Sequence, residues 1–294
     1  MSEKSGSHKS LWSDAWKRLK KNKASLVSFY IIIFVCSVAA LAPWISPYSF
    51  ETQNIDRILE GPSADHWLGT DGLGRDMLSR LIYGARMSMS VGIFTAFFSL
   101  ILGGIYGAIS GWLGGWVDSM MMRFIDILSA IPSLVLLILV SVIFNSIRFS
   151  ENPEIRALVG IFLSLSIVGW VGVARLVRGQ VLQVKQMLYV ESARALGASG
   201  GSILFKHIFP NILGPIIVIL TFQVPSNILF ESFLSFIGLG LQPPYSSWGV
   251  LANDGWRAKS YPHLILSPGT AIFFTMLAFN LLGDGLRDAF DPKK

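Results

Sequence analysis

An apolar run that no charged residue interrupts, MSVGIFTAFFSLILGGIYGAIS, occupies residues 89–110. The hydrocarbon core of a bilayer is about 30 Å thick, and a helix of roughly 20 residues spans it at about 1.5 Å per residue. This stretch is therefore long enough to cross a membrane. With five further stretches of similar length, the predicted spans are approximately Leu26–Trp44, Met89–Ser110, Ile125–Phe144, Leu158–Val177, Pro215–Phe236 and His263–Leu282. The sequence predicts an all-α membrane protein with six transmembrane helices.

The composition of the whole chain supports this class. Of its 294 residues, 52% are hydrophobic and only 14% are charged, whereas an average soluble domain carries about 25% charged residues. So little polar surface argues against a soluble protein, a disordered chain, a collagen-like repeat or a nucleic-acid-binding domain. The single cysteine, Cys36, lies inside an apolar run and cannot form an intrachain disulfide.

Two of the predicted spans carry features that could be misread. The first follows a basic lead and contains Ala40-Leu41-Ala42, which is similar to a signal-peptide cleavage site. Because the run is long and Pro43 would follow the cut, we expect an uncleaved anchor. The third span contains Pro132, which we expect to kink the helix rather than end it.

The basic residues orient the spans. Twice as many Lys and Arg residues fall on one predicted side as on the other, and the positive-inside rule places the richer side in the cytoplasm. Both termini and the loop between spans four and five are therefore predicted to be cytoplasmic. The residues of the inner side are Lys4, Lys9, Lys17, Arg18, Lys20, Lys21, Lys23, Arg123, Arg175, Arg178, Lys185, Arg194, Lys206, Arg287, Lys293 and Lys294. Those of the outer side are Arg57, Arg75, Arg80, Arg86, Arg148, Arg156, Arg257 and Lys259.

Four regions follow from these assignments. Residues 1–24 are predicted to hold a cytoplasmic amphipathic helix in the membrane interface, because Leu11, Trp12, Ala15, Trp16 and Leu19 recur at helical spacing among basic residues. Residues 25–44 form the first transmembrane helix, and residues 45–87 form an external segment. Residues 88–294 form a five-helix core, whose cytoplasmic loop spans residues 185–211. The glycine cluster of residues 103–115 suits close packing of helices in the membrane.

Motifs for catalysis or for a resident cofactor are absent from the sequence. The four histidines show no metal-ligand spacing, and no phosphate-binding loop occurs. We therefore expect no metal site, no cofactor in this chain and no enzymatic activity. Residues 71–76, DGLGRD, have the wrong acid spacing for a calcium loop and instead predict a turn that opens a helix at Asp76.

Two acidic residues lie inside the predicted spans, where burial at the bilayer centre costs about 2.5–3.5 kcal/mol. Asp126 lies one turn from Arg123, and we expect a local ion pair at the membrane interface. Glu231 lies between Phe230 and Phe233 in span five. It either lines a polar pathway or hydrogen-bonds a neighbouring helix, and the sequence leaves both alternatives open.

The loop at 185–211 carries the strongest functional signal. Its first half is helix-forming, and Gly197 is a natural helix stop. Ser199 or Ser202 could cap a second short helix that ends before Pro210. Glu191 and Arg194 are spaced to bridge each other or to meet charges of a partner. A helix–glycine–helix elbow with small alanines on its surface indicates a docking element, with a simple linker as the alternative.

This loop resembles the EAA loop of permease subunits of ABC importers, through Glu191-Ser192-Ala193, Gly197 and Ile208-Phe209-Pro210. The family usually has Ala at position 192 and Leu at position 209, so Ser192 and Phe209 are mild departures. Residues 66–76, 79–86 and 280–292 are similar to peptide/nickel-type C permeases. Residues 10–15, 229–240 and 246–249 are similar to the C subunits of oligopeptide importers. The resemblance covers nearly the whole chain.

The resemblance implies the type I ABC importer permease fold in a bacterial cytoplasmic (inner) membrane. A second homologous permease, two cytoplasmic ATPases that bind ATP and Mg, and an external peptide-binding protein would be the partners, besides membrane lipid. The expected cargo is oligopeptides, moved by alternating access; dipeptides, nickel chelates or another small solute are the alternatives. A membrane-embedded enzyme and a self-sufficient channel or carrier are the rival classes. The ATPases would dock on Glu191, Ser192, Ala193, Arg194, Ala195, Leu196, Gly197, Ala198 and Ser199, and Glu231 is the candidate residue of the translocation path.

Overall fold

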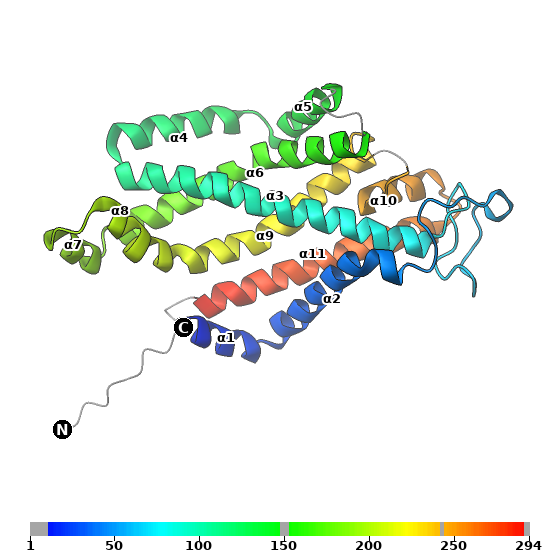
Figure 1. Ribbon diagram of the computed structural model, residues 1–294, viewed down its shortest axis with the longest axis horizontal. Helices are drawn as coiled ribbons and strands as arrows, with labels where there is room; N and C mark the ends of the chain where they lie inside the picture. Colours follow the sequence, from blue (N-terminus) through cyan, green and yellow to red (C-terminus); the bar gives the residue numbers. More distant parts are fainter. Residues whose placement is uncertain (1–10, 148–152, 242–243, 291–294) are drawn as a thin grey trace.

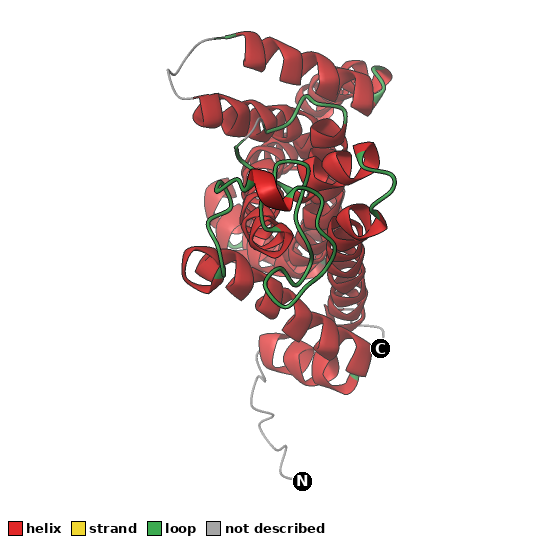
Figure 2. Ribbon diagram, turned by 90° about the vertical axis from the view of Figure 1, so that its right-hand side faces the viewer, coloured by secondary structure: helices red, strands yellow, loops and turns green. Residues whose placement is uncertain are grey.

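The computed structural model describes residues 11–147, 153–241 and 244–290, and in these ranges the regular elements are all helical (Figures 1 and 2). The predicted basic residues Lys4, Lys9, Arg148, Lys293 and Lys294 lie outside the described residues. In chain order the elements are α1 Leu11–Lys21, α2 Lys23–Ile45, η1 Ile55–Arg57, α3 Met77–Leu113, α4 Gly115–Ala130, α5 Ser133–Ser146, α6 Pro153–Lys185, α7 Leu188–Ala195, α8 Gly200–Ile203, η2 Leu204–Ile208, α9 Phe209–Phe236, α10 Trp248–Arg257 and α11 Pro262–Phe290.

Five helical segments of the described chain are long and apolar enough to cross a membrane, and α4 with α5 makes a sixth if this bent pair is one span. Five of the six predicted spans are therefore confirmed in place, and the third corresponds to the bent pair. The pair is bent by 85°, so the prediction that Pro132 only kinks a continuous helix is wrong. The ring of Pro132 disfavours helical geometry at the residue before it, and Ile131 adopts an extended conformation that ends α4.

Helix α3 begins inside the segment that was predicted to be external. The Asp76 side chain accepts the backbone N–H of Ser79 at 2.7 Å and caps α3. The predicted helix start at Asp76 is thus confirmed. The apolar run at 89–110 is only part of α3, which begins earlier, at Met77.

Glycines let α3 and α6 pack closely along their length (Figure 1). A Cβ at Gly103 would lie 2.5 Å from the carbonyl oxygen of Trp170, and one at Gly111 would lie 2.9 Å from that of Arg178. One at Gly107 would clash with the carbonyl oxygen of Ala174. These three glycines recur every four residues and form one face, as membrane helix pairs require. The close packing predicted from the glycine cluster is confirmed for them.

The other long helices complete the bundle. Helix α9 packs against α3 and α11, and α2 packs against α11 and α3. Helix α1 lies beside the end of α11, with Ala15 and Leu19 buried and Trp16 exposed. Figure 1 shows α7 and α8 at one end of the molecule and the segment between α2 and α3 at the opposite end.

Candidate functional site

The loop between α6 and α9 folds as the predicted elbow. Helix α7 ends at Ala195, and Gly197 follows with φ +81°, a conformation that glycine adopts without strain. The backbone N–H of Ala198 donates to the carbonyl of Ala193 at 3.1 Å and closes the turn. The hydroxyl of Ser199 accepts the backbone N–H of Ser202 and caps α8. The predicted helix stop and serine cap are thus confirmed.

The second helix of the elbow does not end before Pro210, so this prediction is wrong. Helix runs continuously from Gly200 to Phe236, through α8, η2 and α9. A π-helical turn precedes the proline, in which the N–H of Phe209 donates to the carbonyl of Leu204. The Asn211 amide also donates to the carbonyl of His207 at 2.6 Å. The helix continues through Pro210 because the π-helical turn before it shifts the backbone hydrogen-bond register.

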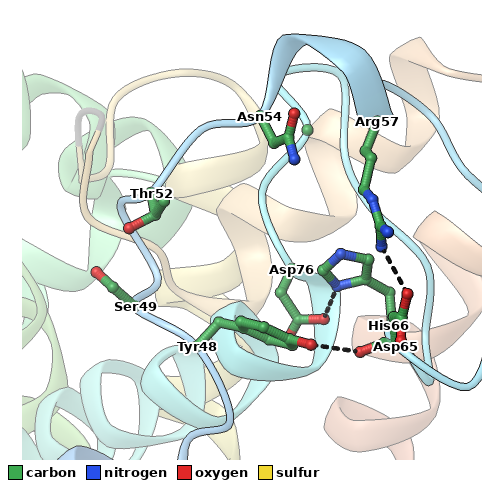
Figure 3. Close-up of a pocket in the computed structure, with 9 residues that line it drawn as sticks. Tyr48, Ser49, Thr52, Asn54, Arg57, Asp65, His66 and Asp76 are labelled. Carbon is green, nitrogen blue, oxygen red and sulfur yellow. Dashed lines mark hydrogen bonds and ion pairs between the residues drawn. The ribbon is translucent and has the colours of Figure 1, made fainter.

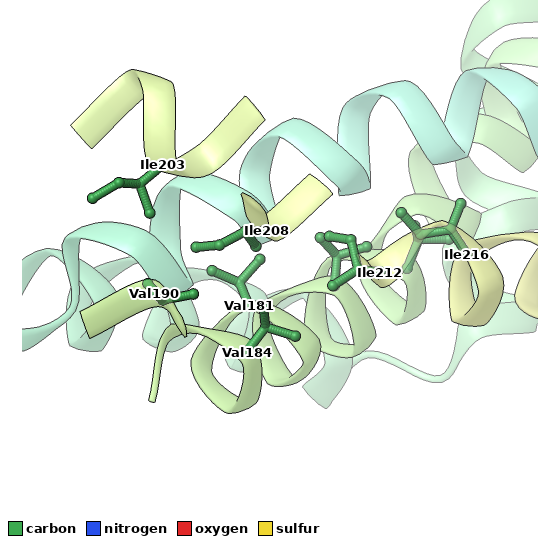
Figure 4. Close-up of a cluster of buried hydrophobic side chains, with 9 residues drawn as sticks. Val181, Val184, Val190, Ile203, Ile208, Ile212 and Ile216 are labelled. Atoms are coloured by element: carbon green, nitrogen blue, oxygen red, sulfur yellow. The ribbon is translucent and has the colours of Figure 1, made fainter. Parts of the chain in front are cut away.

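The inner face of the elbow is anchored to the long helices by a hydrophobic core. Figure 4 shows Val190 of α7 beside Ile203 and Ile208, next to Val181 and Val184 of α6. Each of these side chains is buried. The elbow is therefore packed onto the ends of α6 and α9.

Trp112, at the end of α3, also holds the elbow in place. The Lys185 ammonium donates to its carbonyl at 2.5 Å and lies 5.4 Å from the centre of its ring. The Arg194 guanidinium lies 5.9 Å from the same ring. No motif pointed to Trp112; its place just after a predicted span was the available signal.

The outer face of the elbow is open and partly apolar. Leu188 and Leu196 are 78% and 88% exposed, and Phe205 is also exposed. Glu191 and Arg194 are exposed as well, and the described residues contain no ion pair between them. Among the remaining predicted docking residues, Ala193 and Ala198 are half-buried, and the exposed ones are Ser192, Ala195, Gly197 and Ser199.

Two acids of α4 pair with two arginines of α6. Asp126 accepts from Arg175 at 2.8 Å, so the predicted partner Arg123 is wrong. Asp118 accepts from Arg178 at 2.5 and 2.6 Å. Asp126 lies about one turn from Arg123 along α4, but the ion pair forms with Arg175 of the neighbouring helix. Sequence spacing alone could not show this pairing between helices.

Glu231 is fully buried between α9 and α3. Its two carboxylate oxygens accept from Ser88 at 2.9 Å and from Ser235 at 2.8 Å. Ser88 in turn accepts the backbone N–H of Trp248, the first residue of α10, at 3.2 Å. Within the described chain, Glu231 thus hydrogen-bonds a neighbouring helix, which was one of the two alternatives, and does not face open space.

The predicted external segment, residues 45–87, forms a pocket of about 460 Å³ (Figure 3). Around it, the Tyr48 hydroxyl donates to the carbonyl of Asp65 at 3.0 Å, and Arg57 pairs with the Asp65 carboxylate at 3.0 Å. His66 Nδ1 lies 2.9 Å from Asp76. These contacts fold the segment onto the start of α3.

A buried charge network lies beside this pocket. Asp71 pairs with Arg75 at 2.7 Å and with Arg80, and Arg80 also reaches Asp254 of α10 at 3.1 Å. Burial alone would raise the pKa of the Asp71 carboxyl, but the Arg80 guanidinium and nearby backbone N–H groups hold this pKa below its ordinary value. The sequence indicated a turn here and did not reveal the network.

The family comparisons agree with this architecture. Residues 101–294 match the model of the binding-protein-dependent transport system inner membrane component. Residues 10–62 match the N-terminal transmembrane domain of oligopeptide transport permease C. The two matches together cover the first span, the elbow and every long helix except the first two-thirds of α3, which lies between them.

Curated relatives match over nearly the full length. The dipeptide transport system permease protein DppC of Bacillus subtilis (strain 168) is 45% identical over 95% of this chain and 85% of its own. The oligopeptide transport system permease protein OppC of the same strain is 45% identical over 97% and 90%. The glutathione transport system permease protein GsiD of Escherichia coli O6:K15:H31 is 40% identical over 96% and 90%.

A solved structure supports the fold. A chain of the MetNI methionine ABC transporter in an inward-facing conformation matches with a TM-score of 0.61, at 15% identity, over 72% of this chain and 97% of its own. This agreement confirms the predicted type I importer permease fold. The chain belongs to the family of binding-protein-dependent transport system inner membrane components, as a multi-pass permease subunit of the peptide, dipeptide and glutathione type of ABC importers in the inner membrane.

Proposed function

We propose that this permease moves oligopeptides into the cell by alternating access. Relatives named for dipeptides, oligopeptides and glutathione are all 40% or more identical to it, so a peptide backbone is the feature that their cargoes share. The resemblance of residues 229–240 and 246–249 to oligopeptide importers supports the longer cargo. Dipeptides, nickel chelates or another small solute remain the alternative substrates.

The elbow of α7 and α8 is the proposed docking site for an ATPase. The single observation that carries this proposal is the exposure of Leu188 and Leu196 on a helix pair whose inner face is packed. Exposed apolar side chains on a rigid element, outside the membrane-spanning windows, are typical of a surface that another protein covers. Glu191 and Arg194 flank them with opposite charges.

The partners follow from this docking. Two ATPases bind ATP and Mg, one on this elbow and one on the second permease, and an external peptide-binding protein delivers the cargo. Closure of the ATPases moves the elbow as a rigid lever, because Val190 and Ile203 fix it to the spans. A shift from 1:99 to 99:1 between inward-open and outward-open states requires about 5.5 kcal/mol, which nucleotide binding at two sites can supply.

The proposed orientation places both termini and the elbow in the cytoplasm. The basic residues near α1 and near the elbow support it through the positive-inside rule. Helix α1 then lies at the inner membrane interface, with Trp16 exposed to it. Reporter tags at the termini, tested for accessibility from each side of the membrane, would check this orientation.

Substitutions in the elbow test the docking site. Glu191→Lys and Gly197→Val are expected to uncouple ATP hydrolysis from uptake while the chain still inserts into the membrane. A Cβ at Gly197 meets no atom within 4 Å, so valine is opposed by the left-handed backbone rather than by crowding. Gly197→Asn is the matched control, because asparagine tolerates this conformation. Normal coupling in both Glu191→Lys and Gly197→Val would refute the docking site.

Uptake assays test the cargo. Cells with and without this chain would be given labelled peptides of two to six residues and nickel. Loss of uptake of the longer peptides alone is the expected result. Loss of only dipeptide or nickel uptake would keep the transporter architecture and replace the proposed substrate.

A further inference from the structure

An apolar groove lies between α2 and α11 near the end where α1 packs. It has a volume of about 360 Å³ and is lined along its length by Val27 and Ile31 of α2 and by Phe274, Leu277 and Leu281 of α11. Val27, Phe274 and Leu277 are exposed in this chain. Both helices are long and apolar enough to span the membrane, so hydrocarbon chains are the natural solvent of this groove.

A cluster of positive charge stands at one end of the groove. Lys23, the first residue of α2, lines the groove itself. Lys20 and Lys21 lie one turn or less away, because the chain bends at Asn22, whose side chain accepts the N–H of Ser25 and caps α2. All three lysines are exposed, and Lys21 and Lys23 form no ion pair with any described residue.

Helix α1 places these lysines at the level of lipid headgroups. Ala15 and Leu19 are buried against the bundle, whereas Trp16 is exposed with the Lys20 ammonium 5.2 Å from the centre of its ring. Tryptophan concentrates at the boundary between hydrocarbon and water. The helix therefore lies along this boundary, with the lysine cluster where the apolar groove meets the headgroup region.

We propose that this groove is a binding site for one anionic phospholipid. An acyl chain lies along Val27, Ile31 and Leu277, and the negatively charged headgroup meets Lys21 and Lys23. Basic residues at the end of a cleft between transmembrane helices bind anionic lipids because a zwitterionic headgroup offers no net charge to them. A hydrophobic helix of another subunit would fill the apolar part but would leave both lysines without a counter-charge, so the charge favours the lipid.

Native mass spectrometry of the purified importer complex tests the proposal. After delipidation, the complex would be titrated with phosphatidylglycerol and with phosphatidylcholine of the same acyl chains. The complex is expected to retain phosphatidylglycerol preferentially. Lys23→Gln should weaken that binding about fivefold, and Lys21→Gln/Lys23→Gln by about 25-fold. Lys259→Gln removes the same charge beside Trp256 at the other end of the molecule and should leave binding unchanged.

A groove-filling variant separates the cleft from the charge. Ala24 is exposed and lines the groove, so Ala24→Trp should block the acyl chain while all lysines remain. Loss of phosphatidylglycerol in this variant, with the complex still assembled, supports the proposal. Three results would each overturn it. The first is equal retention of the two lipids, and the second is an unchanged preference for phosphatidylglycerol in the double lysine variant. The third is an Ala24→Trp complex that keeps its lipid but loses the second permease.

Discussion

Two regions of the molecule differ in which side chains they bury: the elbow of α7 and α8, and the external segment before α3. The external segment is rich in charge, yet its central groups Asp71, Arg75 and Arg80 are buried and paired within the chain. The elbow has fewer paired charges and leaves Leu188 and Leu196 in the open. The central charged groups of the external segment are paired within the chain, whereas the elbow leaves apolar side chains exposed.

Buried ion pairs and exposed leucines contribute differently to stability. Buried ion pairs add little net stability, but the loss of one partner is costly because the other charge stays buried. Burial of one leucine side chain contributes about 1.5–3 kcal/mol, and in the proposed docking this free energy would favour association. The proposed docking site is therefore marked by exposed apolar side chains on a rigid element rather than by charge density.

The largest expected effect comes from breaking the external network. Asp71→Asn leaves Arg75 and Arg80 buried beside a neutral group and should lower the free energy of unfolding by about 3–5 kcal/mol. Denaturant titration of the purified chain would measure it. Arg57→Gln is the matched control, because the Arg57–Asp65 pair is exposed and should be dispensable. Comparable losses of unfolding free energy in both variants would show that burial of the ion pair does not determine its contribution to stability.

The glycine face of α3 gives the next largest effect. Gly107→Ala forces a methyl group against the backbone of α6 and should cost about 1–3 kcal/mol of stability. Gly179→Ala on α6 meets open space and should be neutral or stabilising by up to about 1 kcal/mol. The free energies of unfolding of the two variants, measured side by side, would decide this. A neutral Gly107→Ala would refute close packing at this position.

Acidification should loosen the external segment and spare the elbow. Because the pKa of Asp71 is lowered in the folded chain, its carboxylate contributes stability that is complete at neutral pH. That contribution declines below about pH 4, where the unfolded carboxyl begins to bind a proton, and is lost as the pH falls through the folded-state pKa. Hydrogen exchange at Gly69–Asp76 would follow the change. The Asp71→Asn variant should lack this pH dependence, and an equal response of the elbow amides would contradict it.

Much of the fold could be predicted because membrane helices are encoded by length and polarity alone. The spans, the Asp76 cap and the Gly197 stop all follow from local rules. Local rules did not predict the break at Ile131 or the continuous helix through Pro210. Each depends on whether nearby groups hydrogen-bond the backbone carbonyls that a proline leaves unpaired. At Pro210 a π-helical turn and Asn211 do so. Nothing in the sequence near Pro132 distinguishes the two cases.

The candidate site was only partly predictable, for a related reason. The elbow is local, so its helices and turn could be placed residue by residue. Other features depend on which helices lie side by side, and they could not be predicted. These are the exposure of the elbow's leucines, the contact of Trp112 with the elbow, and the Arg175–Asp126 pair between α6 and α4. Glu231 shows the same limit, since both alternatives fitted the sequence and only the position of Ser88 on α3 distinguishes them within the chain.

The smallest effect on stability is expected at Leu196, on the exposed face of the elbow. Leu196→Ser changes a side chain that is almost fully exposed, so the free energy of unfolding of the single chain should change by less than about 0.5 kcal/mol. Affinity for the ATPase should fall by about 1.5–3 kcal/mol, a tenfold to hundredfold loss, because the leucine is buried only on docking. Leu73→Ser, in the external turn, is the matched control and should change neither quantity. If the two variants bind the ATPase equally well in a titration, the open face of the elbow is not where docking draws its free energy.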